Sequence, residues 1–131
     1  MLVQVSSLGT TWLGRNQQLL TWFAPLLILT GLLGFVLPAE KSLMSGATPY
    51  NVFHLIAGAI GLAIVLLRRG NAAILFNLVF GVIDLYQALA GMSGWFPAGL
   101  FELRPADHVV HVVIGLLLVV VGALGKATSL P

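Results

Sequence analysis

The chain contains no cysteine and few charged residues, and each absence excludes certain classes of function. Without cysteine there are no disulfides, no thiol catalysis and no thiolate metal sites. Charged side chains make up 8% of the 131 residues, against about a quarter in soluble domains. The six Lys and Arg residues form no basic patch, so we expect no nucleic-acid partner. The composition is therefore not that of a soluble domain.

Apolar residues are abundant: they make up 59% of the chain and give a mean hydropathy of +1.04. Four apolar runs cover about residues 19–37, 49–67, 72–91 and 105–124. A membrane-spanning helix needs about 20 mostly apolar residues, and each run approaches or reaches this length. We predict an all-α fold, a four-helix transmembrane bundle over residues 19–125. An interfacial arm at residues 1–18 and a short tail at residues 126–131 are expected to flank it.

The charged residues divide unevenly between the two sides of such a bundle. One side receives only cations, which are Arg15, Arg68, Arg69 and Lys126. The other side receives residues of both signs, which are Glu40, Lys41, Glu102, Arg104 and Asp107. The positive-inside rule then predicts that both termini are cytoplasmic. The expected location is an inner membrane, either plasma or photosynthetic.

The second half of the chain partly repeats a pattern of the first half. The first span ends with Gly31-x-x-Gly34-Phe35 and the third with Gly91-x-x-Gly94-Trp95. The next helix in each case opens with proline, a carboxamide or carboxylate, histidine and glycine: Pro49, Asn51, His54 and Gly58, then Pro105, Asp107, His111 and Gly115. This order favours two duplicated helical hairpins. Chance is the competing explanation, because glycine is common in membrane helices.

Polar side chains are expected to meet on the side of the membrane opposite the termini. The second and fourth helices begin on that side and the third helix ends there, so their polar residues lie at similar depth. An isolated Asp84 in hydrocarbon would be costly, so it needs a partner or its proton. The predicted polar cluster consists of Asn51, His54, Asp84, Asp107 and His111.

Several roles are open to this cluster, and the structural one is favoured. In that role Asp107 opens a helix, where the helix dipole favours a carboxylate, and His111 hydrogen-bonds to it. His54 or His111 is also a candidate ligand for haem or chlorophyll. A metal site from His54, Asp107 and His111 is chemically possible, but no metal site is assigned because a tight ligand motif is missing. Proton relay through Asp84 is a further alternative.

Small and aromatic residues are assigned packing and anchoring roles. Glycine lets two membrane helices approach closely, and the predicted packing positions are Gly31, Gly34, Gly58, Gly81 and Gly115. Tyr50, Trp95 and Phe96 fit an aromatic belt at the membrane surface.

These motifs resemble those of a family of small bacterial four-helix integral membrane proteins that is filed as a domain of unknown function. Its pattern is a G-x-x-G-F turn, an N-x-x-H opening the second helix and a D-x-x-x-H opening the fourth. Here the pattern corresponds to Gly31–Phe35, Asn51–His54 and Asp107–His111. The resemblance spans about residues 19–125 and implies a four-helix bundle, without supplying an activity.

The sequence contains no nucleophile–base pair, no phosphate-binding loop and no soluble domain, so we do not expect an enzyme or catalytic residues. The first functional prediction is an accessory subunit of a larger membrane complex, photosynthetic or respiratory. Its expected partners are membrane lipids and other integral membrane subunits. The alternative is a membrane protein that handles a small molecule, protons or a metal through the His/Asp cluster.

Overall fold

The computed structural model describes residues 2–129, with side chains described for residues 12–128. Every regular element in this part of the chain is helical, in the order α1 (Leu2–Val36), η1 (Ala39–Lys41), α2 (Thr48–Leu66), α3 (Gly70–Ser93), α4 (Ala98–Phe101) and α5 (Pro105–Ser129). Four segments are long and apolar enough to cross a membrane: Trp12–Val36, Thr48–Leu66, Gly70–Ser93 and Pro105–Thr128. The predicted all-α bundle of an integral membrane protein is therefore confirmed.

The predicted boundary between an arm and the first span does not coincide with a helix end. A single helix, α1, runs from Leu2 to Val36, and the first span begins within it at Trp12. Asn16, which was assigned to the arm, is fully buried and donates from Nδ2 to the carbonyl of Val121 at 3.0 Å. Its own Oδ1 accepts a bond of 2.9 Å from Asn77 Nδ2. Because a neighbouring helix satisfies this polar residue, α1 stays in the bundle where a polar arm was expected.

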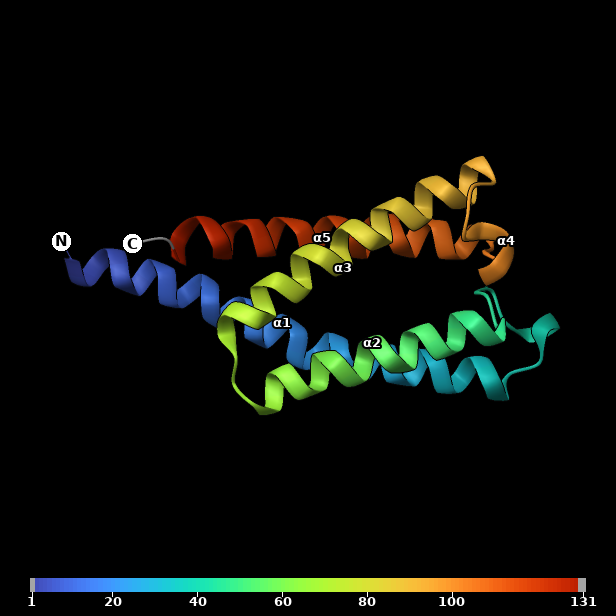
Figure 1. Ribbon diagram of the computed structural model, residues 1–131, viewed down its shortest axis with the longest axis horizontal. Coiled ribbons are helices and arrows are strands. Elements are labelled where there is room, and N and C mark those ends of the chain that lie inside the picture. Colours follow the sequence, from blue (N-terminus) through green and yellow to red (C-terminus); the bar gives the residue numbers. More distant parts are fainter. Residues whose placement is uncertain (1, 130–131) are drawn as a thin grey trace.

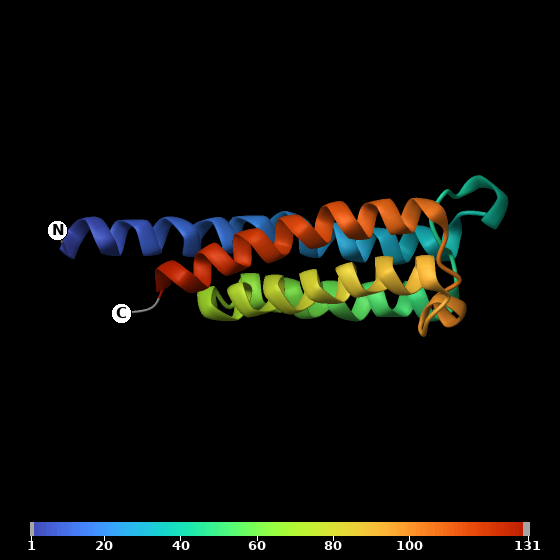
Figure 2. The same cartoon turned by 90° about the horizontal axis from the view of Figure 1, so that it is seen from above.

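The four long helices form two antiparallel hairpins (Figure 1). α1 packs most extensively on α2, and α3 packs most extensively on α5. The α1–α2 and α3–α5 connections lie at one end, which we call the loop end. The short α2–α3 turn lies at the opposite end, the turn end, where α5 finishes and beyond which α1 starts (Figures 1 and 2). Gly94 ends α3 near the loop end with a φ of 72°, a left-handed conformation that glycine adopts at low cost.

The two hairpins repeat one another with an offset of 57 residues. A Cβ on Gly58 would lie 2.9 Å from the carbonyl oxygen of Ala24, and a Cβ on Gly115 would lie 3.0 Å from that of Gly81. Both members of the second pair are 57 positions beyond those of the first. This repetition of contacts supports the duplicated hairpins predicted from the sequence.

The contacts also revise which residues correspond. Gly34 lies against the Asn51 side chain, and Gly91 lies against the ring of His108, again 57 positions further on. The sequence pattern had matched Gly34 with Gly94 and Asn51 with Asp107. In the structure the position in the second hairpin that corresponds to Gly34 is Gly91, and the one that corresponds to Asn51 is His108. The connections before α2 and α5, residues 37–47 and 94–104, are equally long. The mismatch arose because the sequence motifs were matched at offsets of 60 and 56 residues, whereas the helices pack at an offset of 57.

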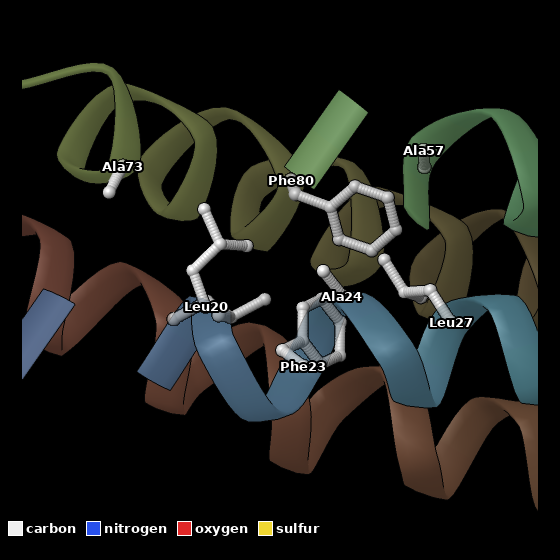
Figure 3. Packing of buried hydrophobic residues seen from close by; sticks show 8 residues of the cluster. Leu20, Phe23, Ala24, Leu27, Ala57, Ala73 and Phe80 are labelled. Atoms are coloured by element: carbon white, nitrogen blue, oxygen red, sulfur yellow. The ribbon is translucent and has the colours of Figure 1, made fainter. Parts of the chain in front are cut away.

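The apolar core lies between α1 and α3 in the middle of the bundle. Leu20, Ala24 and Leu27 point from α1 toward α3, where Phe80 extends to meet them (Figure 3). Phe23 and Phe80, which correspond under the 57-residue offset, meet edge to face with ring centroids 5.4 Å apart. This aromatic pair separates the polar groups of the loop end from the turn end.

Candidate functional site

All five residues of the predicted polar cluster are buried, with exposed fractions between 0 and 6%. They come from three helices, and they lie in the parts of α2, α3 and α5 that approach the loop end. Buried polar groups in a membrane bundle must find partners inside the protein. Asp107 and His111 belong to a hydrogen-bond network, and His54, Asp84 and His111 line a small cavity. Asn51 belongs to neither group.

Asp107 is a fully buried carboxylate that three donors satisfy. Its Oδ2 accepts hydrogen bonds from the backbone N–H of Arg104 at 2.8 Å and of Ser45 at 2.9 Å. Its Oδ1 accepts from the Tyr50 hydroxyl at 2.8 Å. The bond from Arg104 caps the start of α5, and the bond from Ser45 ties the α1–α2 connection to that start. Asp107 therefore holds the loop end together.

Tyr50 connects Asp107 to His111, which do not bond directly as the structural interpretation of the sequence expected. Because the Tyr50 hydroxyl gives its only hydrogen to Asp107, it accepts one from His111 Nε2 at a distance of 3.1 Å. This places the hydrogen of a neutral His111 ring on Nε2. His111 Nδ1 is buried and has no hydrogen-bond partner among the described residues.

The prediction that Tyr50 belongs to an aromatic belt is wrong, because its side chain is fully buried. Trp95 and Phe96, which were assigned to the same belt, are 52% and 75% exposed. Tyr50 points inward because its position on α2 faces α5, where its hydroxyl finds two partners. If the Tyr50 side chain pointed to the membrane surface instead, Asp107 would lose one of its three hydrogen-bond donors.

His54 also presents one ring nitrogen without a partner. Its Nδ1 lies 2.8 Å from the carbonyl oxygen of Tyr50, one helical turn earlier. A carbonyl can only accept, so Nδ1 carries the hydrogen and Nε2 of a neutral ring is an acceptor. Nε2 makes no hydrogen bond to any described residue. The ring packs against Tyr50 with centroids 4.2 Å apart, which fixes its orientation.

Asp84 completes the site by bordering a small cavity with both histidines. The cavity has a volume of about 70 Å³ and reaches Leu26 and Val110 at the outer surface, between α1 and α5. Asp84 is 3% exposed, and its carboxyl group makes no hydrogen bond within the described part of the chain. This volume holds a few water molecules, since one water needs roughly 10–15 Å³ measured this way. The cavity thus brings a carboxyl group and two imidazole rings to one small space.

Asn51 lies outside this site. Its side-chain amide donates to the carbonyl oxygen of Gly46 at 2.9 Å and lies against Gly34. Its Oδ1 has no partner among the described residues. Asn51 therefore braces the connection before α2, and it makes no hydrogen bond to His54 or His111, although the sequence placed it in the polar cluster.

The glycines predicted to pack helices lie at close approaches within the chain. Gly31 faces the backbone and side chains of α2 near Leu55, and Gly58 faces α1 at Ile28. Gly81 and Gly115 face each other's helices, each with a Cβ position 3.0 Å from the other's carbonyl oxygen. A larger side chain at these positions would push two backbones apart.

The donor set does not fit a metal ion or a macrocycle. No group of three or more His, Asp or Glu side chains is arranged to hold a metal within the part of the chain that the structure describes. The metal site considered for His54, Asp107 and His111 therefore does not form. His111 Nε2 donates to Tyr50, and the cavity that His54 lines has a volume of about 70 Å³, well below the roughly 300–1,000 Å³ of drug-sized ligand pockets. Haem or chlorophyll does not fit here.

Three residues of the site were not found from the sequence, namely Tyr50, Ser45 and Arg104. The Arg104 guanidinium donates from Nη1 to the carbonyl oxygens of Ala39 and Ser42, and so joins the two connections of the loop end. The Ser45 hydroxyl donates to the carbonyl of Phe101. A usable signal existed only for Tyr50, which lies four residues before His54 and so on the same helix face.

Comparison of this chain with protein-family models, with curated proteins and with solved structures finds no match. The function is therefore inferred from the geometry of the site.

Proposed function

We propose that the protein is an integral membrane protein that binds protons at its loop end, with Asp84, His54 and His111 as the binding groups. The cavity carries this proposal. It places a buried carboxyl group without a hydrogen bond beside two imidazole rings, each with a ring nitrogen that lacks a partner. Ionisable groups inside membrane spans are costly, and they commonly mark proton or ion sites.

The hydrogen-bond inventory supports a proton as the ligand. With both rings neutral, His54 Nε2 and His111 Nδ1 are acceptors, and a protonated Asp84 is the donor that faces the same space. One or two water molecules in the cavity would connect these groups, since each water needs two to four polar partners. A proton is then transferred among three groups, with an O–H or N–H bond broken on the donor and formed on the acceptor and no bond made or broken between heavy atoms. That the protein is not an enzyme stays a prediction.

The surroundings of the cavity favour proton binding over conduction across the membrane. Phe23 and Phe80 line the cavity on the side of the bundle centre, and their rings lie edge to face. Beyond them is the apolar core, which offers no polar group until the Asn16–Asn77 pair. We infer that the cluster exchanges protons with the loop end and responds to pH on that side.

The charge distribution supports placing the loop end outside the cytoplasm. Arg15, Arg68, Arg69 and Lys126 belong to the turn end, while all four carboxylates lie in the loop-end half. By the positive-inside rule the turn end, and with it both termini, faces the cytoplasm of a cell with an inner or plasma membrane. The proposed proton site then responds to extracytoplasmic pH.

Infrared difference spectroscopy of the protein in lipid nanodiscs tests this function. Two spectra at different pH values are subtracted, and we expect a band from a protonated carboxyl group that changes with pH. Asp84→Asn should remove this band, whereas Glu102→Gln, a control at an exposed carboxylate, should keep it. An identical difference spectrum for wild type and Asp84→Asn would overturn the proposal.

The accessory-subunit function predicted from the sequence remains a separate proposal. Its basis was the lack of a nucleophile–base pair, a phosphate-binding loop and a soluble domain in the sequence. The glycine faces at Gly58 and Gly115, through which such a subunit was expected to pack, are occupied inside the bundle. Purification under mild conditions tests it, because a subunit would leave the membrane with a stoichiometric larger complex. The resemblance to a family of unknown function likewise stays a prediction.

A further inference from the structure

A second feature of the molecule, which the proton site does not use, is an apolar groove between α2 and α3. The groove has a volume of about 440 Å³ and is lined only by apolar side chains. Its outer walls are open, since Ile60 and Leu75 are 52% and 61% exposed. α2 and α3 meet at the turn end and separate toward the loop end, which leaves this space between them (Figure 1).

The duplicated hairpins provide a comparison for this groove within the same chain. The corresponding groove between α1 and α5 has a volume of about 140 Å³. Trp22 and Ile114 line that smaller groove, and the residues 57 positions away from them are Val79 and Ala57. The α2/α3 groove is therefore larger because small side chains stand where its counterpart has bulky ones.

The dimensions of the groove suit one acyl chain of one leaflet. It starts at Ile64, four residues before the turn, and reaches Phe53 along α2. The eleven helical rises from Phe53 to Ile64 span about 16 Å, which is close to half of the roughly 30 Å hydrocarbon thickness. An acyl chain entering from the turn end would fill the groove and stop near the middle of the membrane.

The turn end of the groove carries two arginines and no carboxylate. Arg68 and Arg69 form the turn between α2 and α3, and both are exposed. Ala72 and Ile64, which begin the groove, lie within five residues of both arginines. Arginine binds phosphate through its planar fork of donors, and basic sites between membrane helices bind anionic headgroups. The positive charge at the turn end of the groove thus complements the phosphate of a lipid whose acyl chain lies in the groove.

We propose that this groove is a binding site for an anionic phospholipid, with the phosphate at Arg68 and Arg69 and one acyl chain between α2 and α3. The positive-inside arrangement assigns this lipid to the cytoplasmic leaflet. The headgroup end of this site lies at the turn end, opposite the proton cluster, and Phe80 lines both the inner part of the groove and the proton cavity.

Native mass spectrometry of the full chain released from detergent tests the site, with phosphatidylglycerol and phosphatidylcholine as probes. We expect phosphatidylglycerol to bind about tenfold tighter or more, because two basic side chains contribute to the headgroup contact. Arg68→Gln/Arg69→Gln should remove this preference. The charge-matched control Arg15→Gln/Lys126→Gln should keep it.

Val79→Trp tests the groove itself, because it introduces the residue that lines the smaller α1/α5 groove at the corresponding position, Trp22. This variant should lose tight binding of both lipids while it keeps the helical circular dichroism of wild type. Equal affinity for the two lipids, equal losses in the two arginine-to-glutamine pairs, or unchanged binding in Val79→Trp would overturn the proposal. So would a dimer that Val79→Trp dissociates, because a second copy would then be the occupant.

Discussion

Replacing Tyr50 with phenylalanine removes one hydroxyl group from the network that holds the loop end. Asp107 then loses one of its three donors, and the Nε2–H of His111 loses its acceptor. A buried polar group without a partner costs about 1–3 kcal/mol. Hydrogen bonds measured in membrane bundles average about 0.6 kcal/mol with a maximum near 1.7. Two buried bonds are lost, so we expect the free energy of unfolding to fall by about 1–2 kcal/mol.

The assay is reversible unfolding by SDS in mixed micelles, followed by circular dichroism. Tyr86→Phe is the matched control, since its hydroxyl donates a bond of 2.7 Å to the Phe96 carbonyl oxygen in an exposed setting. Water or headgroups replace that partner, so the control should change stability by less than about 0.5 kcal/mol. Equal losses in Tyr50→Phe and Tyr86→Phe would refute the buried network.

Further predictions concern packing and topology. Gly58→Ala and Gly115→Ala should each destabilise the bundle by about 1–3 kcal/mol in the same assay, because the new Cβ would meet a backbone carbonyl of the facing helix. Gly14→Ala, where a Cβ meets nothing within 4 Å, should be neutral or slightly stabilising, and a loss equal to the other two would contradict this packing. A reporter fused to the C-terminus should be active only in the cytoplasm, and activity of a periplasmic reporter would reverse the assigned orientation.

The fold class was predictable from the sequence because lipid imposes a simple requirement. Four apolar runs of membrane-spanning length leave helices as the natural solution, since every backbone polar group must be satisfied internally. The start of the first span was harder to predict. Asn16 appears in the sequence as part of a polar arm, and only its contacts with Val121 and Asn77 show why it is tolerated inside the bundle.

The candidate site was predictable in its residue types and depth, but not in its connections. His54, Asp84 and His111 could be placed at one end from helix direction alone. The rotation of α2 about its axis decides whether Tyr50 faces lipid or Asp107, and no residue spacing gives that rotation. Ser45 and Arg104 lie in connections whose backbone path depends on the completed bundle. Their hydrogen bonds follow from tertiary structure and leave no periodic pattern.

The central claim is that His54 and His111 present unprotonated ring nitrogens to a cavity that they share with Asp84. Nitrogen-15 NMR of the histidine rings in nanodiscs measures this directly, with His54→Gln and His111→Gln used to assign the signals. At neutral pH we predict hydrogen on Nδ1 of His54 and on Nε2 of His111, because a carbonyl and a tyrosine hydroxyl accept from them. The remaining nitrogens should shift when the loop end is acidified, and Asp84→Asn should alter that response. Reversed tautomers, or ring signals that do not respond to pH, would contradict the account.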